Sequence, residues 1–155
     1  MTTTPVGNSP YGTAIPLTIT LDALGTGGMA VSSTFTPPSD AAGTYYDTAD
    51  IRVNLGAATA LGTTAPPYLQ AGCVAMLDGT NLPYIAPSNG VIVGAETTAW
   101  QTYLESGTGQ YLDIPGLPLL PGATDIAVAI LNGLGVALPS TGVTATLYPR
   151  MGAVG

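Results

Sequence analysis

The segment Asp50-Ile-Arg-Val-Asn-Leu55 alternates polar and apolar side chains along its whole length. Successive side chains of a β-strand point to opposite faces, so a period of two predicts a strand with one buried and one solvent-facing side. The three apolar residues would face the core, whereas Arg52 and Asn54 would face outward.

Further short extended segments lie on both sides of this predicted strand in the sequence. In chain order they cover 15–21, 29–36, 72–77, 82–86, 91–93, 111–114, 125–131, 136–138 and 143–148. We expect the first two to form a hairpin around Gly25-Thr-Gly-Gly28. In 125–131 the residues between Ile126, Val128 and Ile130 are alanines, so the outer face of this strand is nearly as apolar as its inner face.

Three segments carry other expectations. Trp100, Tyr103 and Leu104 would share one face of a helix over 98–106, and Gly107 follows where a helix often ends. A strand is the alternative there, since threonine and aromatic residues also favour sheets. We expect 116–122 to be a proline-framed connection and 149–155 to be a C-terminal tail.

The fold class follows from these segments. The chain has 21 glycines and 14 prolines among 155 residues, so turns are frequent and long helices are not expected. Many short strands separated by turns indicate a sandwich or a barrel. The sequence therefore predicts an all-β protein, an antiparallel β-sandwich with at most one short helix. Residues 1–14 lack periodicity and are expected to be an extended N-terminal arm, with 15–155 as a single domain.

Ionic side chains are scarce in this chain. Only 7% of its residues are charged, namely nine acids and the two arginines Arg52 and Arg150, with no lysine or histidine. An ordinary soluble domain has about 25% charged residues. A surface with so few ions is poorly hydrated, so another polypeptide can cover it at a small cost of desolvation. The composition is typical of a subunit in an assembly.

The same composition argues against several classes of partner. The net charge is −7, and no cluster of cations is present that could neutralise phosphates, so we expect neither nucleic-acid nor membrane binding. The residues 1–10 lack the features of a secretory signal, and the apolar run 126–138 is too short to span a bilayer as a helix. We therefore expect a soluble product made in the cytosol.

Reactive side chains are equally few. Zinc is excluded by the absence of histidine and the single cysteine, and Cys73 in its apolar setting is interpreted as a small buried hydrophobe. Most acids stand beside Gly, Pro, Ser or Thr, where they serve turns. The sequence therefore predicts no enzyme, no catalytic residue and no cofactor. A calcium site at Asp47 and Asp50 is the alternative reading of the one close carboxylate pair.

Tyrosine is the side chain from which contacts with other proteins are expected, because its large ring carries a polar tip. Packing at the edge of the chain's own sheets is the alternative for each of the eight tyrosines. We also expect each arginine to pair with a carboxylate, with subunit interfaces as a natural place. The predicted interface residues are Pro5, Pro10, Tyr11, Tyr45, Tyr46, Tyr148 and Arg150.

The general plan of the chain resembles the small accessory structural proteins of tailed-bacteriophage virions, in particular capsid cement or decoration proteins. The features concerned are the uncharged arm Met1–Ala14 and the β-rich body, with Leu119-Leu-Pro-Gly-Ala-Thr-Asp-Ile126 leading into an apolar strand. The resemblance implies a jelly-roll-like sandwich that forms a homo-dimer or homo-trimer. It implies binding to the major capsid protein on the capsid exterior, after assembly in the host cytoplasm.

Two other functions remain open at this point. A tail or neck component of the same particle would have a similar composition. An extracellular glycan-binding β-sandwich belongs to a different functional class, and it would bind a polysaccharide through exposed aromatic residues.

Overall fold

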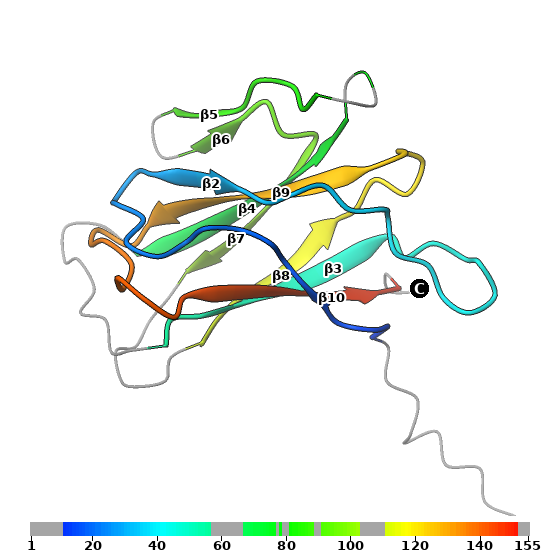
Figure 1. Ribbon diagram of the computed structural model, residues 1–155, viewed down its shortest axis with the longest axis horizontal. Coiled ribbons are helices and arrows are strands. Elements are labelled where there is room, and N and C mark those ends of the chain that lie inside the picture. Colours follow the sequence, from blue (N-terminus) through cyan, green and yellow to red (C-terminus); the bar gives the residue numbers. More distant parts are fainter. Residues whose placement is uncertain are drawn as a thin grey trace, which may run out of the picture.

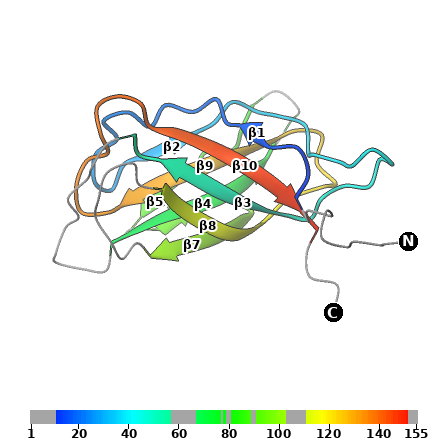
Figure 2. The same cartoon turned by 90° about the horizontal axis from the view of Figure 1, so that it is seen from below.

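Two four-stranded antiparallel sheets are stacked face to face (Figures 1 and 2). The computed structural model describes residues 11–56, 67–76, 78, 81–88, 91–102 and 111–151. Sheet A has the strand order β1 (Ile15–Pro16), β10 (Thr144–Arg150), β3 (Thr48–Asn54) and β8 (Tyr111–Pro118). Sheet B has the order β2 (Met29–Val31), β9 (Ile126–Gly133), β4 (Tyr68–Ala75) and β7 (Thr97–Thr102). The predicted all-β sandwich is confirmed, and the described ranges contain no helix, hence none able to cross a membrane.

The strands pair as a nested series of antiparallel partners. The outermost pair is β1 with β10, followed by β2 with β9, β3 with β8, and β4 with β7. Successive pairs belong alternately to sheet A and sheet B. The second half of the chain thus runs back along the first half. At the turning point, β5 (Ala86–Ser88) and β6 (Val91–Val93) form a separate two-stranded ribbon.

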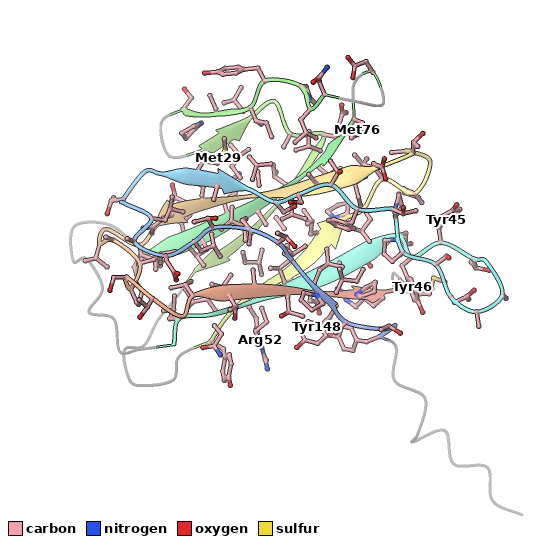
Figure 3. The ribbon with its side chains drawn as sticks, in the orientation of Figure 1. Met29, Tyr45, Tyr46, Arg52, Met76 and Tyr148 are labelled. Atoms are coloured by element: carbon pink, nitrogen blue, oxygen red, sulfur yellow. The ribbon has the colours of Figure 1, made fainter. Side chains whose placement is uncertain are left out.

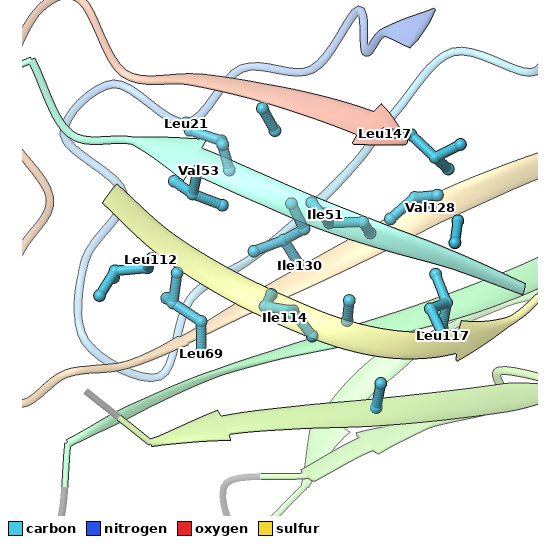
Figure 4. Close-up of a cluster of buried hydrophobic side chains, with 14 of the residues drawn as sticks. Leu21, Ile51, Val53, Leu69, Leu112, Ile114, Leu117, Val128, Ile130 and Leu147 are labelled. Carbon is cyan, nitrogen blue, oxygen red and sulfur yellow. The ribbon is translucent and has the colours of Figure 1, made fainter. Parts of the chain in front are cut away.

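The core lies between the two sheets (Figure 4). In β3 the predicted alternation is observed, since Ala49, Ile51 and Val53 are fully buried and Arg52 is exposed. Each fully buried Leu, Ile or Val contributes about 1.5–3 kcal/mol relative to an exposed position. Cys73 is buried in the same core, as predicted. Other large members are Leu21, Leu69, Leu112, Ile114, Leu117, Ile130 and Leu147.

The two sheets differ in what covers their outer faces. Residues 126–132 of β9 are buried on both faces, and so are residues 69–74 of β4. The ribbon β5–β6 lies over sheet B (Figure 1), where Ile92 packs against Ala129 and Leu131 of β9. This contact explains why β9 is apolar on its outer side. The described residues place no comparable cover over sheet A, whose outer side chains, such as Tyr111, remain exposed.

Several local expectations are wrong. The predicted helix is a strand in its described part, because β7 pairs with β4 from Cys73–Thr97 to Tyr68–Thr102. Its last residues, 103–106, lie outside the described residues. The predicted hairpin is also wrong, since β1 pairs with β10 and β2 pairs with β9. In 15–21 the alternation indicated the buried face correctly, since Ile15, Leu17 and Ile19 pack against the core. In 29–36 it did not, because Ser33 is exposed and Ser32 is buried. Neither pattern carried information about the partner strand.

Other local expectations also differ from the structure. β8 continues to Pro118 into the expected connection, and β10 continues to Arg150 into the expected tail. Residues 136–138 form no strand. At the other end of the chain, the Gly12 N–H donates to the Pro149 carbonyl at 2.7 Å, so residue 12 of the expected arm lies against β10. Residues 1–10 lie outside the described residues, and the division into arm and domain stays a prediction.

Candidate functional site

The outer face of sheet A brings polar side chains from three strands together. Across β10 and β3, Tyr148 stands opposite Asp50 and Thr146 stands opposite Arg52. Across β3 and β8, Arg52 stands opposite Asp113. These side chains point outward because their neighbours in each strand are core residues. In Figure 3, Arg52 and Tyr148 project from the same side of the body.

A hollow of about 410 Å³ opens on this face. This volume falls within the range of roughly 300–1,000 Å³ typical of binding sites. We call it the sheet A hollow. Its lining residues are Tyr11, Asp50, Ile51, Arg52, Asp113, Pro115 and Tyr148.

Two tyrosine rings form an aromatic wall of the hollow. The ring centroids of Tyr11 and Tyr148 lie 6.2 Å apart at an interplanar angle of 76°, an edge-to-face arrangement. The Tyr11 hydroxyl donates to Oδ2 of Asp50 at 2.6 Å. This hydrogen bond is the main cause that raises the pKa of Tyr11 above its ordinary value. The wall is thereby fixed to β3.

A β-bulge in β8 shapes the hollow. Between the pairs Ala49–Leu117 and Ile51–Ile114, the two residues Pro115 and Gly116 oppose the single residue Asp50. Gly116 has φ +71°, a conformation that favours glycine, and its N–H donates to Oδ1 of Asp50 at 2.9 Å. Bulges often occur beside functional sites because they redirect backbone and side chains.

The Asp50 carboxylate is held in its ionised form. Its Oδ1 also accepts a hydrogen bond from Nε of Arg150 at 3.1 Å. Partial burial acts to raise the pKa of Asp50, but the hydrogen bonds from Tyr11, Gly116 and Arg150 together outweigh it, and the pKa lies below its ordinary value. An ionised carboxylate is a poor proton donor, so Asp50 is not suited to act as a general acid.

The second carboxylate of the hollow is also paired. Arg52 donates from Nε to Oδ1 of Asp113 at 2.7 Å and from Nη2 to Oδ2 at 2.8 Å, a bidentate ion pair. This pairing raises the pKa of Arg52. The guanidinium also lies over the Tyr111 ring, 4.9 Å from its centroid. Each of the two carboxylates that line the hollow is therefore paired with a guanidinium, Asp113 with Arg52 in the lining and Asp50 with Arg150 beside it.

The structure unites some of the predicted interface residues and separates others. Tyr11, Tyr148 and Arg150 lie together at the sheet A hollow. Tyr46 instead packs against the core and over Gly12, where a Cβ atom would come within 2.6 Å of its ring. Tyr45 is half exposed and bridges Ser39 across the turn at Asp40. Pro5 and Pro10 lie outside the described residues.

Sequence reasoning did not identify Asp50 and Asp113 as members of the site. The expectation that each arginine pairs with a carboxylate is confirmed, but the partners depend on which strands are neighbours. Asp113 alternates with Leu112 and Ile114, which was a signal for its outward direction. The calcium reading of Asp47 and Asp50 gains no support, since within the described ranges no three potential metal ligands cluster and Asp50 pairs with Arg150.

A balanced, aromatic and partly apolar hollow is suited to binding a neutral, extended ligand, because such a ligand leaves the ion pairs intact. In three comparisons with known proteins, the chain matches no family model, no curated protein and no solved structure.

Proposed function

We propose that this chain is a non-enzymatic structural protein of a virion, a capsid cement or decoration subunit that bridges neighbouring shell proteins. The observation that carries the proposal is the outer face of sheet A, which the described residues leave without a cover and where tyrosines and both arginines of the chain gather. Tyrosine and arginine are enriched in protein interfaces and in their energetic centres.

The distribution of charge supports contact with protein. Both arginines and two of the nine acids form ion pairs on this face, so the other seven acids account for the net charge of −7. Like charges repel approaching acidic surfaces, whereas a locally neutral face does not. Another polypeptide can therefore cover the outer face of sheet A with little electrostatic cost.

The strand pairing supports a finer assignment of the fold. Four nested antiparallel pairs that alternate between two sheets are what a jelly roll contains, and we propose that the sandwich is of this type. The β5–β6 ribbon would then be an insertion at the tip of the rolled hairpin.

The mechanism would be mechanical. A shell that contains packed DNA fails when its subunits separate, and a protein that bridges several of them adds contact area. Attachment at several points raises avidity without a single strong contact. Because few of these contacts are ionic, binding would persist at high salt concentration.

The proposal is tested on virions of the virus that encodes the chain. Quantitative mass spectrometry should find it in numbers comparable with the major capsid protein. Virions made without it should release their DNA at a lower temperature, and added purified chain should restore the original temperature. Absence of the chain from virions would refute the proposal, and a few copies per particle would indicate the tail or neck instead.

The sheet A hollow favours a second candidate function, the glycan-binding module. Tyrosine rings beside a charged, hydrogen-bonding pair such as Arg52 and Asp113 suit a sugar with many hydroxyl groups. A glycan array probed with the full chain tests this candidate, with Tyr148→Ala as the variant that should lose any signal. Binding that disappears in this variant would favour the glycan module over the virion protein.

A further inference from the structure

We infer that the sheet A hollow receives the N-terminal segment, residues 1–10, of a second copy of this chain. Copies would thus be joined by segments that reach from one body to the hollow of the next. The inference rests on the proposed function in one respect, since it takes the chain to be a subunit of an assembly. It goes further by naming the occupant of the hollow.

The chemistry of the hollow matches that of the segment. Proline-containing segments tend to adopt the extended polyproline II conformation and dock on grooves with aromatic walls. Tyr11 and Tyr148 supply such a wall, with Pro115 and Ile51 as further apolar lining. The segment Met1-Thr-Thr-Thr-Pro-Val-Gly-Asn-Ser-Pro10 contains two prolines and no charged side chain.

The charges of the hollow select for a neutral occupant. Asp50 is paired with Arg150, and Asp113 is paired with Arg52. A charged side chain placed among these pairs would compete with one partner and leave the other uncompensated, which is costly away from water. An uncharged segment covers the pairs without breaking them. It also lets two chains of net charge −7 associate while their acidic surfaces stay apart.

The direction of the backbone favours a second copy over the chain's own segment. Tyr11 is bridged antiparallel to Arg150, and Gly12 is hydrogen-bonded to Pro149. Traced toward the N-terminus, the backbone from Ile15 to Tyr11 therefore runs toward the C-terminal end of β10, whereas the hollow lies back along the strand toward Tyr148.

To fill its own hollow, the chain would have to reverse direction at Pro10. The ring of Pro10 fixes its φ, and it biases the preceding residue toward extended conformations. Tyr11 is already committed to the sheet and cannot supply the second half of a turn. The hollow of a neighbouring molecule is reached without such a reversal.

Disulfide trapping between full-length chains tests the inference. One variant carries Pro5→Cys in the segment, and another carries Thr146→Cys on the outer face beside Tyr148. The control partner is Ser88→Cys, an exposed position on the β5–β6 ribbon over the other sheet. The native Cys73 does not interfere, because it is buried and its burial raises the pKa of the thiol to about 11.

We expect Pro5→Cys mixed with Thr146→Cys to form the cross-linked dimer at least about tenfold faster than Pro5→Cys mixed with Ser88→Cys, because a docked segment has a raised effective concentration. The glutamate variant Thr146→Glu should lower the association constant by a similar factor in sedimentation experiments. Circular dichroism of each variant checks that the sandwich is intact.

Equal cross-linking rates with both partners would overturn the inference. The double variant that carries both Pro5→Cys and Thr146→Cys tests the choice of a second copy. Formation of the disulfide within single molecules at high dilution would overturn that choice. The presence of the chain in virions is a readout that is separate from the trapping of dimers. If dimers are trapped but the chain is absent from virions, only the proposed function is refuted. If the chain is present in virions but no dimers are trapped, only this inference is refuted.

Discussion

The Tyr11 hydroxyl lies 2.6 Å from Oδ2 of Asp50, a residue 39 positions further along the chain. The other carboxylate oxygen of Asp50 accepts hydrogen bonds from the Gly116 N–H and from Arg150. One side chain thus connects Tyr11, β3, the bulge of β8 and the end of β10. The stability of this face and the shape of the sheet A hollow both depend on it.

Replacing Tyr11 with phenylalanine removes the hydroxyl and keeps the ring. We expect Tyr11→Phe to lower the free energy of unfolding by less than about 1 kcal/mol, because the lost hydrogen bond is exposed to solvent. Urea denaturation measures the change. Tyr11→Ala removes the ring contact with Tyr148 as well and should cost more. Equal effects of the two variants would show that the ring contributes nothing.

Asp50 should make the stability depend on pH. Its pKa in the folded chain lies below the ordinary value of 3.8, so the unfolded chain takes up the proton first as the pH falls. The stabilisation is fully present above about pH 4 and is lost as the pH falls through the folded-state pKa. We expect the free energy of unfolding to decrease in that range.

The variant Asp50→Asn should be less stable at neutral pH and should show a flatter decrease below pH 4. Glu96→Gln, which removes one negative charge away from the hollow, is the control for the change in net charge. Chemical denaturation at several pH values gives the comparison. A decrease below pH 4 that is as steep in Asp50→Asn as in the parent chain would contradict this role for Asp50.

Local patterns in the sequence predicted the strands that have one buried and one exposed face. In β3 and β10 the alternation follows directly from this two-sided environment, so the outward direction of Arg52 could be read from the sequence. The partner of each strand could not be read in this way. Thr48 pairs with Arg150 across 102 positions, and no local signal specifies such a register.

The error at β7 has a physical cause. Trp100 and its neighbours have helical spacing, but six consecutive residues from Thr97 pair with β4, which is buried on both faces. A buried strand without a neighbour would leave its backbone groups unsatisfied, and this cost exceeds a weak local helical preference. The β5–β6 ribbon over sheet B could not be predicted from the sequence either. The apolar outer face of 125–131 was the one sign that this strand has a cover.

The site was predictable only in part. Tyr11, Tyr148 and Arg150 were selected because of their chemistry, and the structure places them together. Asp50 entered the sequence analysis only as part of the calcium alternative with Asp47. Its bonds to Gly116 and Arg150 span 66 and 100 positions, so no local pattern pointed to them. Membership of the hollow is therefore a property of the topology.

The side chain of Gln70 should help to hold the β5–β6 ribbon against sheet B. Its Oε1 accepts the Ile92 N–H at 2.7 Å, whereas its buried Nε2 finds no hydrogen-bond partner among the described residues. Gln70→Leu leaves the Ile92 N–H unpaired, which costs about 1–3 kcal/mol of stability, but it also removes the unpaired amide nitrogen. We expect little change in global stability and faster hydrogen exchange in residues 82–88 and 91–95.

Ser32→Ala is the matched control for Gln70→Leu. It removes a side-chain acceptor from the Val128 N–H on the same sheet, in a hydrogen bond that involves no residue of the ribbon. Its effect on exchange should be confined to the neighbourhood of Val128. Unchanged exchange in the ribbon of Gln70→Leu would show that apolar packing alone holds it.

Gly72 should tolerate no side chain while the ribbon is in place. A Cβ atom there would lie 2.7 Å from the Cβ of Ala95, closer than two such atoms approach. We expect Gly72→Ala to lower the free energy of unfolding by about 1–3 kcal/mol through overpacking. At Gly122 nothing lies within 4 Å of the corresponding position, so Gly122→Ala should leave stability nearly unchanged. Equal losses of stability in both variants would mean that Ala95 and the ribbon do not pack against Gly72 of β4.

Cys73 should report the opening of the core. It is fully buried between the sheets, and burial raises the pKa of its thiol to about 11, so little thiolate is present at neutral pH. We expect a maleimide to modify it only as fast as the sandwich unfolds, with a rate that stops rising at high reagent concentration. The unfolding rate from denaturant-jump fluorescence should equal this limit. Rapid modification of the native chain would mean that the sheets separate locally at Cys73 without global unfolding.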